Sequence, residues 1–265
     1  MKANKVVEMA TVLAVKTVAQ GIVQATLRCP KIAARVVPGQ FVTIKPAVPG
    51  KLLRRPFTVW SRRKDVIQLV FQVVGPNTEA YSRWQVGQEV ELFGPIGRGI
   101  VINLGVRCVI MIAGGCGFAS MYFPARQVIR QNQARLIVGA GFKSQAHVFG
   151  VQAFKNLGVE LKYVTQEDGG RTAVDLFREI VFSDGSLPPS EQIQVLTCGP
   201  EPMMQRVAEI CCDEGMACTV ILERMIGCGT GDCMGCAVAV KGGGMPKHLC
   251  EDGPAFNGQE VIWNE

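Results

Sequence analysis

Four cysteines near the end of the sequence have a spacing that could bind iron and sulfide. Cys228, Cys233 and Cys236 lie within nine residues, and Cys250 follows a glycine-rich stretch, which gives the pattern C-x4-C-x2-C-x13-C. Plant-type [2Fe–2S] sites use this order of thiolates, with the fourth cysteine at a distance. Glycines in the loop allow backbone N–H groups to turn toward the negative sulfides without Cβ clashes. The spacing therefore predicts a one-electron redox centre.

Two other uses of clustered thiols are possible. A structural zinc site usually pairs two C-x2–4-C units, whereas the second half of this pattern offers Cys250 alone. A thioredoxin-like dithiol at Cys233-x-x-Cys236 is expected near a βαβ unit, but this pair lies in a glycine-rich tail. Both comparisons favour an iron–sulfur cluster.

A one-electron centre requires a partner that can split electron pairs, and two stretches suit a flavin nucleotide. In Arg54-Arg55-Pro56-Phe57-Thr58, a guanidinium could clamp a pyrophosphate while Phe57 lies against the flavin and Thr58 donates to a ring nitrogen. The turn Gly75-Pro76-Asn77-Thr78 precedes a short predicted helix and offers N–H groups and a hydroxyl to phosphate. The structural alternatives are a basic surface strand and an ordinary turn with Thr78 as N-cap.

Two glycine turns further along the chain suit a nicotinamide dinucleotide. The stretch from Ala113 to Ala119 reads AGGCGFA and follows an apolar strand, where glycines would let a pyrophosphate approach the backbone. It lacks the spacing of the dinucleotide fingerprint, so a tight connection is the alternative. Thr197-Cys198-Gly199-Pro200 ends a later strand at the same edge and could border a nicotinamide; the alternative is a buried cysteine and a turn.

The elements that must position these motifs change character near residue 104. Before it, short β runs separated by Gly and Pro predict an antiparallel barrel or sandwich. After it, apolar strands alternate with helices, which predicts a parallel sheet covered on both faces. The predicted strands are residues 6–15, 21–28, 39–46, 55–60, 66–74, 87–94, 107–115, 134–142, 159–166, 192–200 and 217–224, with helices at 77–84, 119–131, 173–182 and 202–214.

Composition narrows the class of protein. Hydrophobic residues make up 48% of the 265 residues, enough for a sizeable core, and the N-terminal apolar run is interrupted by Lys5, Glu8 and Lys16, so we expect neither an export signal nor a membrane span. Eleven cysteines without such a signal indicate a reducing, cytoplasmic location. The net charge of +6, the basic residues between 54 and 64 and the four clustered thiols are also compatible with an alternative function, a metal-sensing regulator. That basic stretch shows no recognition helix, so we expect no nucleic-acid partner.

Together these motifs resemble the ferredoxin–NADP reductase superfamily, and within it the electron-transfer subunits of heteromeric, NAD-linked dihydroorotate dehydrogenases. The resemblance covers nearly the whole chain and is most specific at the cysteine loop, with Glu223-Arg224-Met225 before it and the stretch 250–254 after it. It implies FAD in an antiparallel β-barrel over residues 1–103, NAD(H) in a parallel α/β domain over 104–222, and a [2Fe–2S] cluster in a segment over 223–265. The implied cofactor-binding residues are Arg55, Pro56, Phe57, Thr58, Val70, Phe71, Gln72, Gly75, Asn77, Thr78, Gly114, Gly115, Gly117, Cys198, Gly199 and Pro200, with Cys228, Cys233, Cys236 and Cys250 as metal ligands.

The resemblance also implies a function. Electrons would pass from an FMN-containing dihydroorotate dehydrogenase catalytic subunit, in a heterotetramer that serves pyrimidine biosynthesis, through the cluster and FAD to NAD. The chain would thus be an oxidoreductase subunit without catalytic residues toward dihydroorotate, and related reductase modules for sulfite reductase, hydrogenase or ferredoxin are the alternatives. After the second strand of the α/β half, Lys143 and Ser144 without a nearby acid favour NADP, whereas the resemblance implies NAD, which we expect.

Overall fold

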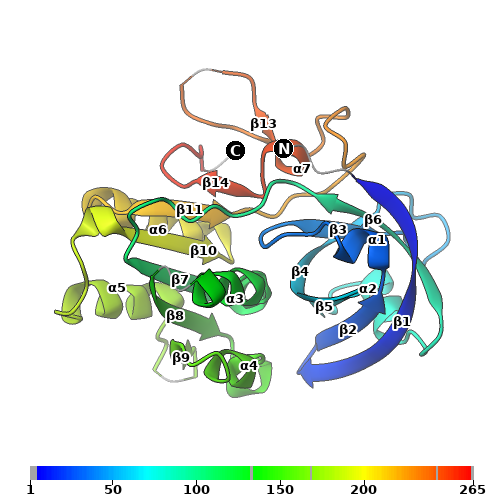
Figure 1. The fold of residues 1–265 in the computed structure, drawn as a ribbon, viewed down its shortest axis with the longest axis horizontal. Helices are drawn as coiled ribbons and strands as arrows, with labels where there is room; N and C mark the ends of the chain where they lie inside the picture. The colour runs from blue at the N-terminus through cyan, green and yellow to red at the C-terminus, as the bar shows by residue number, and fades with distance from the viewer. Residues whose placement is uncertain (1–4, 132–133, 168, 243, 264–265) are drawn as a thin grey trace.

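Six antiparallel strands in the first part of the chain close into a barrel (Figure 1). This computed structural model describes residues 5–131, 134–167, 169–242 and 244–263. The barrel order is β1-β2-β5-β4-β3-β6. Its strands are β1 (Val6–Ala19), β2 (Ile22–Arg28), β3 (Phe41–Ile44), β4 (Arg55–Arg63), β5 (Val66–Gln72) and β6 (Glu89–Ile96), with α1 (Pro30–Ala33) and α2 (Pro76–Ser82) in the connections. The predicted antiparallel barrel is confirmed.

The barrel encloses its own core because its strands alternate inward and outward residues. Ala10 and Val12 of β1, Leu27 of β2 and Leu69 of β5 are fully or almost fully buried and belong to one apolar cluster. Alternation with period two places these side chains on one face of each strand. Closure also removes the edge strands that an open sheet of this size would expose.

A second sheet follows the barrel in the chain, and five of its six strands are parallel. Its order is β14-β11-β10-β7-β8-β9, and only β14 runs antiparallel to its neighbour. The strands are β7 (Cys108–Gly114), β8 (Arg135–Phe142), β9 (Glu160–Thr165), β10 (Ile193–Cys198), β11 (Ala217–Ile221) and β14 (Ala255–Asn257). The predicted parallel α/β sheet is confirmed, but the strand β14 had not been predicted.

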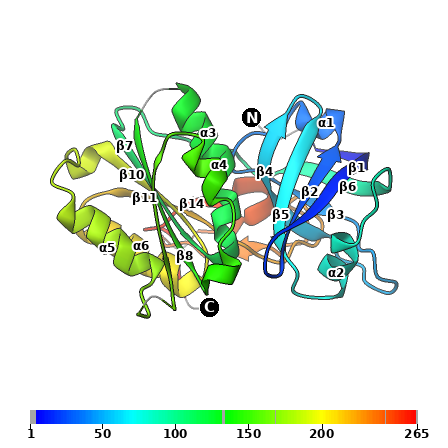
Figure 2. The ribbon, with the colours of Figure 1, turned by 90° about the horizontal axis from the view of Figure 1, so that it is seen from below.

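Helices cover both faces of this sheet, as Figure 2 shows with α5 and α6 on one side and α3 and α4 on the other. Along β7, Cys108, Ile110 and Ile112 pack into the core under α5 and α6, while Val109 and Met111 pack into the core under α3 and α4. A strand with both faces buried reads as a continuous apolar run, which explains the sequence CVIMIA. The helices are α3 (Tyr122–Gln131), α4 (Val151–Lys155), α5 (Ala173–Ser183) and α6 (Glu201–Asp213), with short 3-10 turns η1 (Gly115–Ser120), η2 (Gln145–His147) and η3 (Ser190–Gln192).

The helix boundaries differ from prediction at one functional turn. The helix expected from residue 119 begins at Tyr122, because the glycine turn first continues as the 3-10 turn η1. By contrast, α5 begins as predicted, with Thr172 accepting a hydrogen bond from Asp175 N and the Asp175 carboxylate accepting from Thr172 N. Among the helices of the described residues, none is long and apolar enough to cross a membrane.

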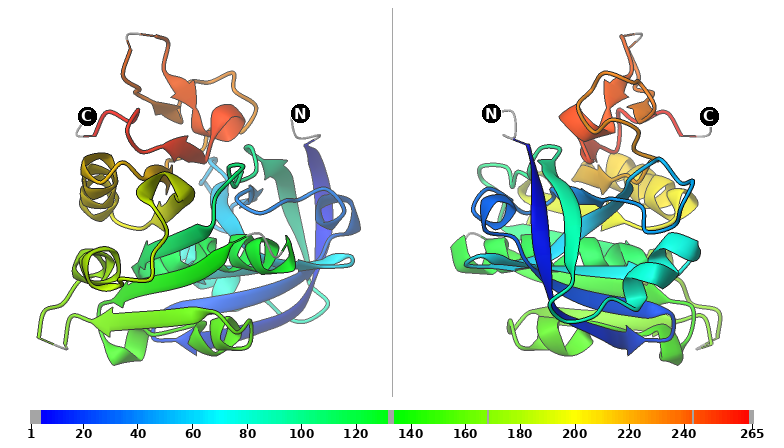
Figure 3. Two further views of the ribbon diagram at one scale, coloured as in Figure 1. Left: turned by 60° about the vertical axis from the view of Figure 1, so that its left-hand side comes forward. Right: turned by 90° about the vertical axis from the view of Figure 1, so that its right-hand side faces the viewer.

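The C-terminal segment, residues 223–263, lies across the top of both halves (Figures 1 and 3). It contains β12 (Ala237–Val238), β13 (Lys247–His248) and α7 (Leu249–Asp252), and it adds β14 to the edge of the α/β sheet. It also contacts the barrel directly, because Gly97 N donates to Cys250 O at 3.1 Å. Gly97 has φ +82°, and a Cβ there would lie 2.5 Å from Gly253 O. The segment therefore bridges the barrel and the sheet.

This close approach predicts different costs for two glycine substitutions with the same backbone conformation. Gly105 also has φ +82°, but no atom lies within 4 Å of a Cβ built there. We expect Gly105→Ala to lose about 1–2 kcal/mol of unfolding free energy from left-handed strain. We expect Gly97→Ala to lose about 1–3 kcal/mol more, because its methyl group has no room against Gly253. Urea unfolding of both variants measures the difference, and equal losses would show that the contact does not hold the segment.

Candidate functional site

A cavity of about 310 Å³ lies where the barrel, the α/β sheet and the C-terminal segment meet. Its size and its mainly apolar walls are typical of cofactor sites. We call it the flavin cavity. The barrel contributes Phe41, Arg55, Pro56, Phe57, Thr58, Val70, Phe71, Gln72, Val74 and Thr78; the α/β domain contributes Cys116, Ala119, Ser120, Ile221 and Leu222; the C-terminal segment contributes Glu223, Arg224, Leu249 and Pro254.

Most of the barrel residues expected to bind FAD are brought together at this cavity. Arg55 to Thr58 form the start of β4, and Val70 to Gln72 form the end of β5, its antiparallel neighbour. The ring of Phe57 packs against Phe71 and Tyr81, with centroids 5.1 and 6.0 Å away. These contacts make a rigid aromatic wall, which is suited to a flat ring system.

The two neighbouring arginines have separate roles. Arg54 forms an ion pair with Glu91 on β6 and lies 5.9 Å from the centre of the Phe93 ring, so it belongs to the barrel structure. Arg55 lines the cavity, and its Nη1 donates to Leu53 O at 2.6 Å, which holds the guanidinium in place. Arg55 therefore has donors placed for a pyrophosphate, as a planar guanidinium can bind two oxygens at once.

The turn before α2 is stabilised mainly by its own hydrogen bonds. Thr78 Oγ1 accepts from the N–H groups of Val74 (2.9 Å) and Gly75 (3.1 Å), and Gly75, rather than Thr78, is the N-cap. Asn77 Oδ1 accepts from Ala47 N at 2.9 Å, so this side chain pins the connection between β3 and β4. Thr78 lines the flavin cavity, whereas Gly75 and Asn77 do not.

The two glycine turns expected to bind a nucleotide pack against each other at the carboxyl edge of the parallel sheet. A Cβ on Gly117 would lie 2.4 Å from Cys198 O, and a Cβ on Gly199 would lie 2.9 Å from Gly114 N. These glycines therefore serve the contact between the turns. Gly115 is different, because it has φ +53° and no atom within 4 Å of a Cβ position, so its backbone is open to a ligand. Ligands of open α/β sheets bind at this edge.

Two thiols and one carboxyl group border the turns and the cavity. Burial raises the pKa of Cys116 to about 12, and it also raises the pKa of Cys198, so both thiols are neutral at pH 7. Burial likewise raises the pKa of Glu223, whose side chain lines the flavin cavity. The sequence drew attention to Glu223 only as part of a motif, because its place at the cavity depends on the fold of the C-terminal segment.

An acidic residue near the expected adenosine site was missed by sequence reasoning. Glu167 follows β9, and its Oε2 accepts from Gln145 N at 3.1 Å, so the carboxylate lies beside the Lys143–Ser144 stretch that follows β8. Residues 139–144 contain no acid, as expected, but parallel pairing of β8 and β9 brings the carboxyl end of β9, and with it Glu167, beside them. Arg171, by contrast, pairs with Glu179 on α5. The signal in the sequence that could have identified this acid is the position of Glu167 just after the predicted strand 159–166.

The four cysteines of the C-terminal segment form two pairs. Cys236 and Cys250 have their Sγ atoms 3.3 Å apart, and Cys228 and Cys233 are linked by a hydrogen bond from Cys228 N to Cys233 Sγ at 3.4 Å. For comparison, two thiolates on one tetrahedral metal ion lie about 3.8 Å apart when each bond is about 2.3 Å. A [2Fe–2S] cluster requires two ligands on each of its two irons, which matches two pairs.

The backbone of the cluster loop, residues 228–236, supports these thiols. Thr230 N donates to Cys228 Sγ at 3.3 Å and Gly235 N donates to Cys233 Sγ at 3.4 Å, while Gly229 and Gly231 have positive φ. Burial opposes ionisation of Cys228, but hydrogen bonds from Thr230 and Cys233 outweigh it and lower its pKa to about 6. Thiolate is the form that binds metal.

The described residues contain no group of three or more His, Cys, Asp or Glu side chains arranged around a single metal ion. A zinc site needs four ligands converging on one ion, whereas the paired cysteines fit two irons with bridging sulfides. The pairing of Cys228 with Cys233 and of Cys236 with Cys250 matches the two protein ligands that each iron of such a cluster takes.

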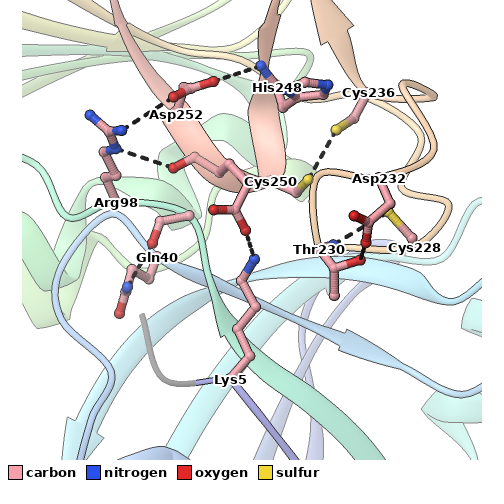
Figure 4. A network of polar contacts seen from close by, with 12 residues as sticks. Lys5, Gln40, Arg98, Cys228, Thr230, Asp232, Cys236, His248, Cys250 and Asp252 are labelled. Atoms are coloured by element: carbon pink, nitrogen blue, oxygen red, sulfur yellow. Dashed lines mark hydrogen bonds and ion pairs between the residues drawn. The ribbon is translucent and has the colours of Figure 1, made fainter. Parts of the chain in front are cut away.

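A network of polar contacts surrounds Cys250 and joins α7 to the barrel (Figure 4). Asp252 accepts from His248 N at 2.9 Å and from Arg98 Nη2 at 3.2 Å. Gln40 Nε2 donates to Gly97 O at 2.7 Å, which steadies the turn that contacts α7. Lys5, at the start of the barrel, forms an ion pair with Glu251.

Comparison with known proteins identifies a family for the C-terminal segment and relatives for most of the chain. Residues 223–262 match the family described as the iron-sulfur cluster binding domain of dihydroorotate dehydrogenase B. The "Dihydroorotate dehydrogenase B (NAD(+)), electron transfer subunit" of Caldanaerobacter subterraneus is 34% identical over 85% of this chain and 87% of its own length. The protein of the same name from Desulforamulus reducens is 31% identical over 96% of this chain and 97% of its own length.

Solved structures share the fold. A structure of NADH-dependent reduced ferredoxin-NADP oxidoreductase, described in connection with flavin-based electron bifurcation, has a TM-score of 0.83 and 25% identity and covers 96% of this chain and 90% of its own. Ferredoxin-NADP+ reductase from Plasmodium falciparum has a TM-score of 0.65 with 10% identity over 77% of this chain and 90% of its own, which shows the fold alone.

The separate roles of the arginines predict which one controls flavin affinity. We expect Arg55→Ala to weaken FAD binding by about 1.5–3 kcal/mol, because it loses a charge-assisted contact. The control is Arg63→Ala, which removes the same charge from the exposed far end of β4. Flavin titration of the deflavinated variants measures both affinities. If the two variants retain FAD equally well, Arg55 does not bind it.

Proposed function

Because this chain belongs to the family of electron-transfer subunits of dihydroorotate dehydrogenase B, we propose that it carries electrons between a partner dehydrogenase and NAD. The observation that carries the proposal is the shared wall of the two redox sites. Leu249 and Pro254 line the flavin cavity, and Cys250, a proposed cluster ligand, directly follows Leu249. A cluster held by Cys250 would therefore lie next to a flavin in that cavity.

Each site has residues suited to its cofactor. Arg55 would hold the pyrophosphate of FAD, Phe57 and Phe71 would border its ring, and the open backbone at Gly115 would receive NAD(H). When bound, FAD would convert between hydride exchange with NAD(H) and one-electron exchange with the cluster. The apolar walls keep water away from the ring, and the neutral thiol of Cys198 adds no charge beside the nicotinamide.

The partner in this proposal is an FMN-containing catalytic subunit that oxidises dihydroorotate for pyrimidine synthesis, in a heterotetramer. The names of the relatives support a catalytic partner, since each is an electron-transfer subunit. A cytoplasmic location is also proposed, on the ground that none of the eleven cysteines forms a disulfide.

A second candidate is a reductase module that serves another partner. The likeness to the NADH-dependent reduced ferredoxin-NADP oxidoreductase, over 96% of this chain, supports it. The same cofactors would then pass electrons to a ferredoxin-type acceptor. Two assays distinguish these candidates. One measures NADH formation from dihydroorotate with the catalytic subunit, and the other measures electron transfer to ferredoxin.

Removing cluster ligands should stop electron flow between the subunits but not flavin reduction. We expect the purified complex to contain about two iron and two sulfide per chain and to form NADH from dihydroorotate. Cys250→Ser should lose the iron and the coupled reaction while NADH still reduces the flavin. The control is Cys212→Ser, an exposed thiol on α6 outside the site. Zinc without acid-labile sulfide in the unaltered protein would contradict the proposal.

Glu167 predicts a preference for NADH over NADPH. An acid near the adenosine ribose accepts from the 2′-hydroxyl and repels a 2′-phosphate. We expect a higher kcat/KM for flavin reduction with NADH, and Glu167→Gln should narrow the preference about tenfold, as loss of about 1.4 kcal/mol implies.

Stopped-flow flavin bleaching with each nucleotide measures the preference. Glu191→Gln, an exposed acid in η3 at the amino end of β10, is the matched control and should leave the ratio unchanged. If NADPH is the better donor and Lys143→Ala removes its advantage, the ribose site has been misread.

A further inference from the structure

An ion pair links the first described residue of the chain to the helix that carries Cys250. Lys5 Nζ contacts the Glu251 carboxylate across 246 positions of sequence, and Figure 4 shows the Lys5 side chain pointing from the barrel toward this helix. The two side chains are only 13% and 20% exposed. Surface ion pairs contribute little because water screens them, but this pair is largely shielded.

The Glu251 side chain also packs against the cluster loop. A Cβ on Gly231 would lie 2.8 Å from Glu251 Cγ, so the loop approaches the glutamate as closely as a glycine permits. The nearby pair between Arg98 and Asp252 is different, because the Arg98 side chain is 67% exposed. The shielded charges next to the cluster loop are therefore those of Lys5 and Glu251.

The Lys5–Glu251 pair lies next to a proposed cluster ligand, because Glu251 directly follows Cys250 in the chain. A positive charge favours negative charge that reduction adds nearby, and a negative charge disfavours it, since both effects are Coulombic. Screening by water is weak here because both side chains are largely shielded.

We propose that the Lys5–Glu251 pair sets the reduction potential of the cluster, with Lys5 favouring and Glu251 disfavouring the reduced state. This inference rests on the proposed function, since it requires a cluster on Cys228, Cys233, Cys236 and Cys250. One-electron reduction adds one negative charge and breaks no bond, and the electron comes from the partner dehydrogenase. The potentials of such clusters depend on net charge and solvent exposure around the ligands. Lys5 is thus a tuning residue contributed by the barrel.

The test is a double-mutant cycle that removes the charges of Lys5 and Glu251 singly and together in the complete complex. Redox titration followed by electron paramagnetic resonance gives the midpoint potential, and iron and sulfide analysis gives cluster content. Lys5→Met should lower the potential, because it removes the shielded positive charge of Lys5 while the Glu251 carboxylate stays. Glu251→Gln should raise it, and the double variant should return toward the original value. Lys5→Arg keeps the charge and should shift the potential less than Lys5→Met does.

The control is Lys16→Met, which removes the same charge from an exposed position near the other end of β1 and should leave the potential unchanged. Unchanged potentials in Lys5→Met and Glu251→Gln, with full cluster content, would overturn the inference and leave the pair a purely structural contact. If Lys5→Met fails to hold iron, Glu251→Gln still decides, because its potential must rise. Absence of iron and sulfide from the unaltered protein would instead refute the proposed function.

Discussion

The backbone contact between the turn after β6 and α7 is the constraint on which the composite site depends. The N–H group of Gly97 donates to Cys250 O. The two backbone segments approach so closely that a Cβ on Gly97 would have no room against Gly253. Because this contact fixes α7 on the barrel, Leu249 and Pro254 become walls of the flavin cavity. The proposed cluster and flavin sites are therefore brought together by one short stretch of chain.

Cysteine side chains lie in two opposite environments in this protein. In the cores, burial raises the pKa of Cys29 to about 12 and of Cys108 to about 11, so these thiols behave as small apolar residues. In the cluster loop, backbone N–H groups point at Cys228 and Cys233, and the pKa of Cys228 falls to about 6. Local hydrogen bonds, rather than residue type, distinguish the Cys228 thiol from the thiols of the cores.

Much of the architecture follows from local sequence. Short β runs separated by Gly and Pro in the first hundred positions predicted the barrel, and the apolar run in β7 predicted a strand buried on both faces. The spacing of Arg55 to Thr58 and of the four cysteines identified candidate sites, because strand period and ligand spacing are properties of neighbouring residues. The start of α3 was misplaced, since η1 depends on packing of the glycine turn against Cys198.

The sequence alone determined the order of barrel, α/β domain and cysteine segment, the thiol spacing and the flavin motif, since each depends on residues close together in the chain. Only the tertiary structure decided which distant residues complete the sites. It placed β14 beside β11, Glu167 beside Gln145 and Lys5 beside Glu251. Such pairings depend on which strands become neighbours and where their ends meet, and no local periodicity encodes that choice.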